Sequence, residues 1–165
     1  MKVICVAGTP GTGKTTISKK LAQKLKFYYL DVNGFASQNR LYEGYDKKRK
    51  TKIVDIKKLN NKLIQFIDFF KKSNKKYNGI IIDSHLSHYL PKKYVDFCIV
   101  TKCDIKELNK RLKKKKFGKY KIQENIQAEI FDICLNESKE SKHKILAIDT
   151  TKGFNINKIS KQLGG

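Results

Sequence analysis

The run GTPGTGKTT at residues 8–16 follows an apolar segment at residues 3–7 and precedes a segment rich in Lys, Leu and Ala. Its spacing, G-x-x-x-x-G-K-T, is that of a phosphate-binding P-loop between a strand and a helix. In such a loop backbone N–H groups turn toward the phosphates, Lys14 would reach the β and γ oxygens, and Thr15 would offer its hydroxyl to Mg²⁺. The positive end of the following helix adds to this attraction. Because strand, loop and helix occur in the required order, a nucleoside triphosphate site with Mg²⁺ is favoured over a plain Gly-rich turn.

The length and apolar content predict one domain. With 165 residues, 39% of them apolar, the chain is long enough for one core and too short for two ordinary domains, so a single P-loop domain is expected over residues 1–165. Its N-terminus lacks the pattern of a signal peptide, and its longest apolar runs are strand-sized. A soluble, cytoplasmic protein is therefore expected.

The four cysteines, Cys5, Cys98, Cys103 and Cys134, lack C-x-x-C spacing. Cys5 and Cys98 lie in apolar, strand-like runs, where a thiol behaves as a small hydrophobic group. Buried, reduced thiols are therefore favoured over a zinc site.

The chain is strongly basic, with 37 Lys and Arg against 15 Asp and Glu and a formal net charge of +22. Such an excess favours contact with nucleic acid or another polyanion. Nearly all of the excess is lysine, however, and a lysine-rich proteome gives the same composition without an RNA partner. The charge therefore leaves both explanations open.

Apolar runs alternate with helical patterns along the chain. Strands are predicted at residues 2–7, 27–31, 79–83, 94–101 and 144–148, and helices near residues 14–25, 56–72, 104–114, 121–141 and 155–163. Five short apolar strands separated by helices indicate an α/β fold with a parallel sheet covered on both faces.

Two segments do not fit this core. Residues 33–54 contain three aromatic residues and the basic cluster at residues 47–50, and residues 113–121 read KKKKFGKYK. Because functional loops are carried on rigid scaffolds, these segments are predicted to handle the substrate.

Asp83 ends the apolar strand GIIID and is the candidate to hold Mg²⁺ or its water shell opposite Thr15. His85, two residues further at the carboxyl end of the strand, is predicted to lie near the γ-phosphate and to position a water or a neighbouring loop. His85 and His88 could also form a zinc site, which is less favoured without further matched ligands. For His88 a surface or helix-capping role is expected.

Arg111 and the lysines at residues 113–116 follow an amphipathic helical pattern. Phosphoryl transfer requires cations around the migrating group, and a mobile basic lid would supply them. Any single lysine here could instead lie on a solvated face, whereas the planar guanidinium of Arg111 suits bidentate phosphate contact.

With these residues the chain resembles the adenylate kinase isoenzyme 6 family, called the coilin-interacting nuclear ATPase in animals, which has archaeal members. The resemblance covers nearly the whole chain. Its marks are GTPGTGKTT (8–16), LYEGYD (41–46), IIIDSHLSHYLP (80–91) and KIQENIQAEIFDICLNE from Lys121.

The resemblance implies a nucleoside-monophosphate-kinase fold with a five-stranded parallel sheet, a monophosphate-binding segment at about residues 31–54 and a lid at about residues 114–124. It implies the reaction ATP + AMP ⇌ 2 ADP with Mg²⁺, and ATP hydrolysis during maturation of the small ribosomal subunit. The implied partners are ATP and AMP, with a small-subunit ribosomal protein and rRNA, and the implied state is a monomer or a transient complex.

The resemblance also assigns residues to these roles. The implied ATP-binding residues are Gly11, Gly13, Lys14, Thr15, Thr16 and Lys115; the monophosphate-binding residues are Gly34, Phe35, Arg40, Tyr42 and Tyr45; the catalytic residues are Lys14, Asp83, His85 and Arg111; and Thr15 and Asp83 serve the metal. The chain departs from the family at Lys115-Lys116-Phe117, where Arg-Gly-Tyr is usual, and at Ser37, where Arg is common and Arg40 could substitute.

Three functions can be compared. One is a kinase that transfers the γ-phosphoryl group of ATP to a monophosphate, and the second is an ATP-driven assembly factor that binds a ribosomal protein or rRNA. A small GTPase is disfavoured because the guanine-reading Asn-Lys-x-Asp pattern does not follow the last strands; Thr101-Lys102-Cys103-Asp104 is only loosely similar.

Overall fold

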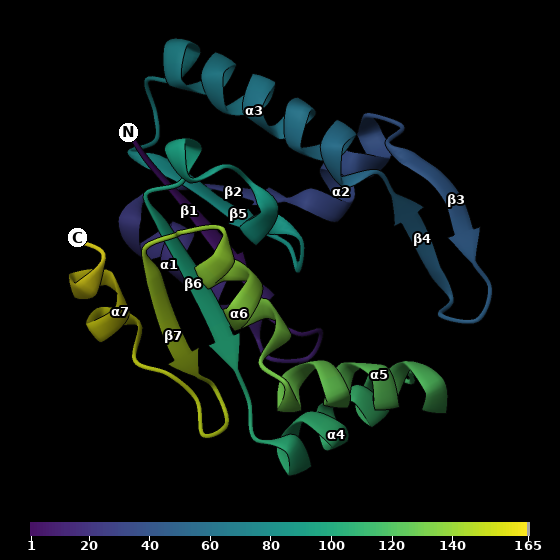
Figure 1. Cartoon of the computed structure of the whole chain (residues 1–165). Coiled ribbons are helices and arrows are strands. Elements are labelled where there is room, and N and C mark those ends of the chain that lie inside the picture. The colour runs from purple at the N-terminus through teal and green to yellow at the C-terminus, as the bar shows by residue number, and fades with distance from the viewer. Residues whose placement is uncertain (165) are drawn as a thin grey trace.

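A five-stranded sheet forms the centre of the structure, a computed structural model that describes residues 1–164 (Figure 1). Its strands are parallel and lie in the order β2-β5-β1-β6-β7. They are β1 (Lys2–Ala7), β2 (Tyr28–Asp31), β5 (Gly79–Asp83), β6 (Phe97–Lys102) and β7 (Ile145–Asp149). The predicted α/β fold is confirmed. The strand expected at 94–101 begins later, at Phe97, because Lys92–Tyr94 forms a 3₁₀ turn.

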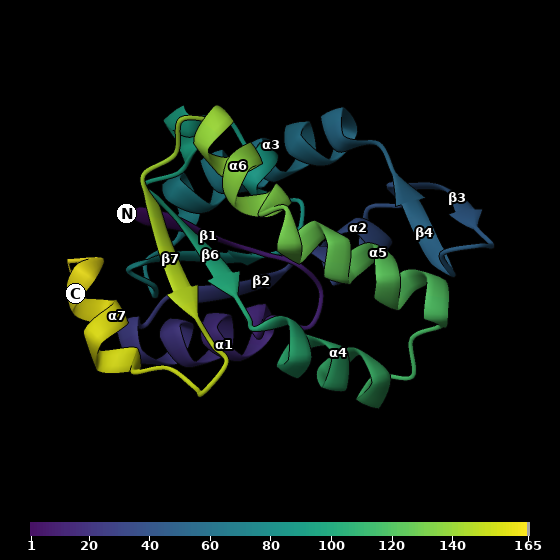
Figure 2. The same cartoon turned by 60° about the horizontal axis from the view of Figure 1, so that its bottom comes forward.

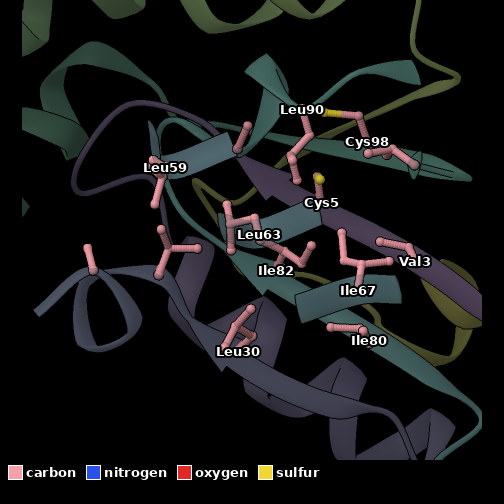
Figure 3. Close-up of a cluster of buried hydrophobic side chains, with 14 of the residues drawn as sticks. Val3, Cys5, Leu30, Leu59, Leu63, Ile67, Ile80, Ile82, Leu90 and Cys98 are labelled. Carbon is pink, nitrogen blue, oxygen red and sulfur yellow. The ribbon is translucent and has the colours of Figure 1, made fainter. Parts of the chain in front are cut away.

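Helices cover both faces of the sheet, as predicted. The helices of the structure are α1 (Lys14–Leu25), α2 (Val32–Gln38), α3 (Ile56–Ser73), α4 (Ile105–Lys114), α5 (Lys119–Ile130), α6 (Ile133–Glu140) and α7 (Ile156–Gln162), of which α4 and α5 lie beyond the sheet. On one face Leu59, Leu63 and Ile67 of α3 pack over the buried side chains of β1 and β5 (Figure 3). On the other face α1 and α7 pack together through Ile17, Leu21 and Ile159. Because β1 and β5 are covered on both sides, their sequences are continuous apolar runs.

The first inserted segment forms helix α2 and the antiparallel hairpin of β3 (Tyr42–Asp46) and β4 (Thr51–Val54). The hairpin projects away from the sheet beyond the end of α3 (Figure 1). The side chain of Asp31 accepts a hydrogen bond from the amide of Asn33, at 3.1 Å, and so starts α2. The expectation that this whole segment lies outside the core is wrong for α2, which packs into it through Val32 and Ala36; only the hairpin projects.

The second inserted segment is the turn at residues 115–118 between α4 and α5, which lie side by side as a helical hairpin (Figure 2). Leu108 and Leu112 of α4 pack against Ile122 and Ile126 of α5. The single helix predicted at 121–141 is wrong: it breaks into α5 and α6 because Asp132 has φ = 52° and pairs with Lys102.

The cysteines are free thiols, as expected, and Cys5, Cys98 and Cys103 are buried. Burial raises the pKa of each of these three thiols. Within residues 1–164 none of the helices combines the length and the apolar character needed to cross a membrane.

Candidate active site

The P-loop takes its shape from glycines with positive φ. Gly8 has φ = 138°, and a Cβ placed there would lie 2.4 Å from Thr101 Oγ1 and 2.7 Å from the Thr101 carbonyl oxygen. Gly13, with φ = 93°, precedes the first residue of α1. Only glycine adopts such conformations without strain next to close backbone. The loop therefore turns tightly from β1 onto the N-terminus of α1, where backbone N–H groups can receive phosphates.

Lys14 lies folded over the loop. Its Nζ donates hydrogen bonds to the carbonyl oxygens of Gly8, at 2.7 Å, and Thr9, at 3.0 Å. Burial lowers the pKa of Lys14 to about 8, although Cys134, Asp83 and Glu129 act in the opposite direction. The ammonium group is thus positioned at the phosphate site, and it is protonated for the most part at pH 7.

Thr15 in the first turn of α1, Asp83 at the carboxyl end of β5 and Tyr29 of β2 form a small polar cluster. Asp83 Oδ2 accepts hydrogen bonds from Thr15 Oγ1, at 2.7 Å, and from Tyr29 Oη, at 2.9 Å. Burial and the neighbouring carboxylate raise the pKa of Tyr29, so its hydroxyl remains a donor. A hydroxyl and a carboxylate side by side are oxygen ligands of the kind that Mg²⁺ takes, so the residues fit this ion.

Two cavities, of about 800 Å³ and about 700 Å³, meet beside this cluster. The first is lined by Gly11, Gly13, Lys14, Thr15, Thr16 and Asp83, which are the residues predicted for ATP and metal. The second lies under the β3–β4 hairpin. Ser84 and His85, together with Asn33 and Thr51, line both. The site therefore has room for two ligands that meet at the end of β5.

His85 projects into this junction. Although its side chain is exposed to the cavities, the surrounding protein removes much of its hydration, and this effect lowers its pKa; the positive charges of Lys14 and Lys121 act in the same direction. The imidazole is therefore neutral at pH 7 and can accept a hydrogen bond. His85 lines both cavities, and its closeness to the reacting phosphate stays a prediction.

The basic lid also reaches the first cavity. Lys115, Lys114 and Lys121 line it, together with Phe117. Arg111 lines it too, but its guanidinium is engaged by the Thr150 carbonyl oxygen, at 2.9 Å, and by Glu107, at 2.9 Å. Bidentate contact between Arg111 and a phosphate would require it to leave these partners, so the lid lysines are better placed for that role.

Only some of the residues predicted to bind the monophosphate line the second cavity. Tyr42 and Tyr45 line the second cavity. Gly34 and Arg40 are not among the residues that line it, and Phe35 packs against Phe66 in the core at 5.6 Å between ring centroids. The cations that line this cavity are Arg49, Lys50 and Lys52. The basic cluster of the hairpin thus supplies the positive charge that the prediction had placed at Arg40.

Arg49 also joins the hairpin to the lid. Its guanidinium donates to both carboxylate oxygens of Glu124, at 2.6 to 3.0 Å, and to Asp46 at 2.9 Å. Lys48 lies over the ring of Tyr120 at 4.2 Å. These contacts are exposed to solvent, so each stabilises the pairing of hairpin and lid only weakly. Arg49 and Asp46 also line the second cavity, so a ligand phosphate there could compete for the guanidinium.

The surface or capping role expected for His88 is wrong. Its side chain is 1% exposed, and Nε2 lies 2.9 Å from Glu137 Oε2. The 3₁₀ turn at Ser87–Tyr89 packs beneath α6, which covers the ring. Burial lowers the pKa of His88, although Glu137 opposes this effect. His88 supports α6, and in the described residues it forms no metal cluster with His85.

Several side chains that contact the P-loop or Asp83 carry no local sequence signal of that role, among them Tyr29, Glu129, Thr101 and Thr150. Tyr29 was indistinguishable from other aromatic residues of its strand, and Glu129 from the other charged residues of a helical pattern. Glu129 is only 5% exposed and accepts a hydrogen bond from Thr9 Oγ1 at 2.6 Å. The sequence signal for Glu129 is its place in AEIF (128–131), within the stretch that carries the family resemblance.

Comparison with known proteins gives consistent matches. A family model described as an AAA domain matches residues 4–132. The chain is 39% identical over 148 residues to the "Putative adenylate kinase" of Methanocaldococcus jannaschii, covering 90% of this chain and 76% of that protein. It is 33% identical over 162 residues to the "Adenylate kinase isoenzyme 6 homolog FAP7" of Saccharomyces cerevisiae, covering 96% and 78%.

Among solved structures the chain resembles deoxyadenosine kinase from M. mycoides with bound dATP. The TM-score is 0.58 with 17% identity, and all of both chains is covered. Shikimate kinase from Bacteroides thetaiotaomicron matches with a TM-score of 0.57 and 13% identity, over 99% of each chain. At these identities the likeness concerns the fold, which is that of P-loop kinases.

Proposed function

The chain belongs to the adenylate kinase isoenzyme 6 family, and on that premise we propose that it transfers the γ-phosphoryl group of ATP to AMP. The observation that carries this proposal is the pair of cavities that share Ser84 and His85. A P-loop alone would bind the donor. A second cavity with tyrosines and cations, open to the same polar cluster, supplies a place for an acceptor phosphate.

The residues of the first cavity would bind and orient ATP. The P-loop amides and the Lys14 ammonium would take the β and γ oxygens in place of the carbonyls of Gly8 and Thr9. The lid lysines, among them Lys115, would surround the charge that spreads over the equatorial oxygens. Closing of the lid over the cavity would exclude water and favour AMP over hydrolysis.

Thr15 and Asp83 would hold Mg²⁺, since their oxygens lie side by side at the carboxyl edge of the sheet. An ion held by these two residues would supply positive charge against the phosphate oxygens of ATP. Tyr29 would keep the Asp83 carboxylate turned toward Thr15 through its own hydrogen bond.

On the acceptor side, Tyr42 and Tyr45 offer aromatic surface for a base, and Arg49 offers a planar fork for a phosphate. Arg49→Ala is expected to raise KM for AMP about tenfold and to leave KM for ATP nearly unchanged, because Arg49 lines the second cavity and not the first. Initial-rate kinetics with each substrate varied would measure this. Lys47→Ala, in the same hairpin turn, serves as the control; equal effects of the two variants on AMP would contradict the assignment.

An acceptor panel tests the proposal itself. Purified protein is incubated with Mg-ATP and each nucleoside monophosphate, and ADP is quantified by chromatography. The expected result is ADP formation that AMP stimulates more than the other monophosphates do. ADP at the level of the ATP-only control for every acceptor would overturn the proposal.

A second candidate, ATP hydrolysis that drives assembly of a ribosomal particle, is favoured by the neutral His85 at the junction of the cavities. With the second cavity empty of AMP, His85 can accept a hydrogen bond from a water in line with the γ-phosphate. The net charge of +22 supports contact with RNA or with an acidic protein surface. If the protein shows no salt-resistant association with small-subunit components, either with ATP or with ADP bound, this role is excluded.

His85→Ala is expected to lower ATP hydrolysis about 10- to 100-fold while ATP affinity changes less than threefold, because the side chain would hold the acceptor and not the donor. Phosphate-release assays and calorimetric titration with ATP measure the two quantities. His85→Asn, which keeps a hydrogen-bonding side chain, should recover part of the rate. An unchanged hydrolysis rate in His85→Ala would remove this residue from the mechanism.

A further inference from the structure

Glu129 is a buried carboxylate with three different partners at the edge of the P-loop. Its Oε2 accepts from Thr9 Oγ1 at 2.6 Å, and its Oε1 accepts from the amide of Cys103 at 3.0 Å and pairs with Lys102 Nζ at 2.9 Å. The side chain is only 5% exposed. Buried charges require such partners, and hydrogen bonds to them are strong. Thr9 lies in the P-loop, Lys102 is the last residue of β6, and Cys103 precedes the N-cap of α4.

Thr9 is hydrogen-bonded to several other residues of the P-loop. Its carbonyl oxygen accepts from the amide of Thr12 at 3.2 Å, from Thr12 Oγ1 at 2.7 Å, and from Lys14 Nζ at 3.0 Å. The side chain of Thr9, in contrast, donates only to Glu129. Whatever fixes residue 9 therefore also fixes the turn of the loop and the resting position of the Lys14 ammonium.

Glu129 also closes the base of the α4–α5 hairpin. Cys103 immediately precedes Asp104, the N-cap of α4, whereas Glu129 lies in the last turn of α5. Their hydrogen bond joins the two ends of the hairpin, which carries the lid turn at its far end (Figure 2). A second contact runs from α4 to the loop, since a Cβ on Gly11 would lie 2.9 Å from Leu108. The hairpin and the P-loop are thus joined both at Thr9 and at Gly11.

We propose that Glu129 is a positioning residue that couples the base of the lid hairpin to the P-loop, by holding the Thr9 peptide in the conformation that receives ATP. The inference rests on the proposed function only in that ATP is the ligand. It assigns to Glu129 no contact with the nucleotide. When the lid turn moves, the α4–α5 hairpin would rotate about its Cys103–Glu129 end, which is hydrogen-bonded to the P-loop at Thr9. The position of the hairpin and the conformation of the phosphate-binding loop would therefore change together.

The test compares Glu129→Gln, Thr9→Val and the double variant by calorimetric titration with ATP at pH 7. Glu129→Gln is expected to weaken ATP binding about 10- to 100-fold, and Thr9→Val about tenfold, as for hydrogen bonds to a charged group. The double variant should be no weaker than Glu129→Gln alone, because both changes act on the same charged hydrogen bond. Glu140→Gln, an exposed carboxylate of α6, is the control.

Binding at pH 7 within twofold of the wild type in both single variants, with only a lower melting temperature, would overturn the proposal and leave Glu129 as a purely structural residue. If Glu129→Gln does not fold, Thr9→Val, which keeps the carboxylate and its pairing with Lys102, decides alone. Because ATP binding is measured and not turnover, the result does not depend on AMP as the acceptor. A wild type that binds ATP without transferring to any monophosphate would contradict the proposed function and leave this test intact.

Discussion

Lys14→Ala is expected to lower phosphoryl transfer and ATP hydrolysis at least about 1000-fold while the fold is retained. The ammonium group is the side-chain cation bonded to the loop carbonyls of Gly8 and Thr9, where the β and γ oxygens of ATP would lie. In the closed site this charge would face oxygens that gain charge in the transition state, where an electrostatic partner acts most strongly. Coupled-enzyme and phosphate-release assays measure the two rates.

Lys14→Ala is expected to be at least as stable as the wild type, although its activity falls. Burial lowers the pKa of Lys14, which means that the folded protein holds the charged form at a cost that alanine does not carry. The melting temperature at pH 7 is therefore expected to be unchanged or higher. Lys24→Ala, an exposed lysine in the last turn of the same helix, is the control for loss of one charge. Turnover within tenfold of the wild type in Lys14→Ala would show that another cation serves the phosphates.

The strands and the P-loop could be predicted because their patterns are local. A run such as GIIID is apolar over its whole length only if both faces of the strand are covered, and its terminal carboxylate then falls at the edge of the sheet. The placement of Asp83 beside Thr15 follows from this rule. Helical spacing likewise predicts a buried position for Phe35, since Val32, Phe35 and Ala36 lie three and four residues apart on one face of α2.

The remaining parts of the site depend on contacts between distant segments. Thr9 and Glu129 are 120 residues apart, and nothing near either residue indicates the partner. The break between α5 and α6 depends on Asp132, whose left-handed conformation coincides with its pairing to Lys102 on β6. His88 is buried because α6 packs over it and offers Glu137. Tertiary packing decides these features: it buries His88, and it holds Asp132 in a left-handed conformation that ends a helical pattern.

Asp83→Asn is expected to lower kcat/KM for Mg-ATP about 100- to 1000-fold and to raise the Mg²⁺ concentration needed for half-maximal rate at least about tenfold. The carboxylate beside Thr15 is the charged group that we propose binds Mg²⁺, and an amide keeps its shape without its charge. The amide oxygen can still accept from Thr15 or Tyr29, so the fold should persist, with a melting temperature close to that of the wild type. Activity measured over a Mg²⁺ titration at saturating ATP gives both numbers.

Tyr29→Phe separates the charge of Asp83 from its orientation. This variant keeps the carboxylate and removes only the hydrogen bond from Tyr29 Oη, at 2.9 Å, while Thr15 Oγ1 still donates at 2.7 Å. The loss of one of two donors is expected to lower kcat/KM about 3- to 10-fold, far less than Asp83→Asn, because the charge at the metal site is unchanged. If Tyr29→Phe and Asp83→Asn cause equal losses, orientation and not charge is the contribution of this cluster. If neither changes the Mg²⁺ dependence, the ion is held elsewhere and the assignment of Thr15 and Asp83 fails.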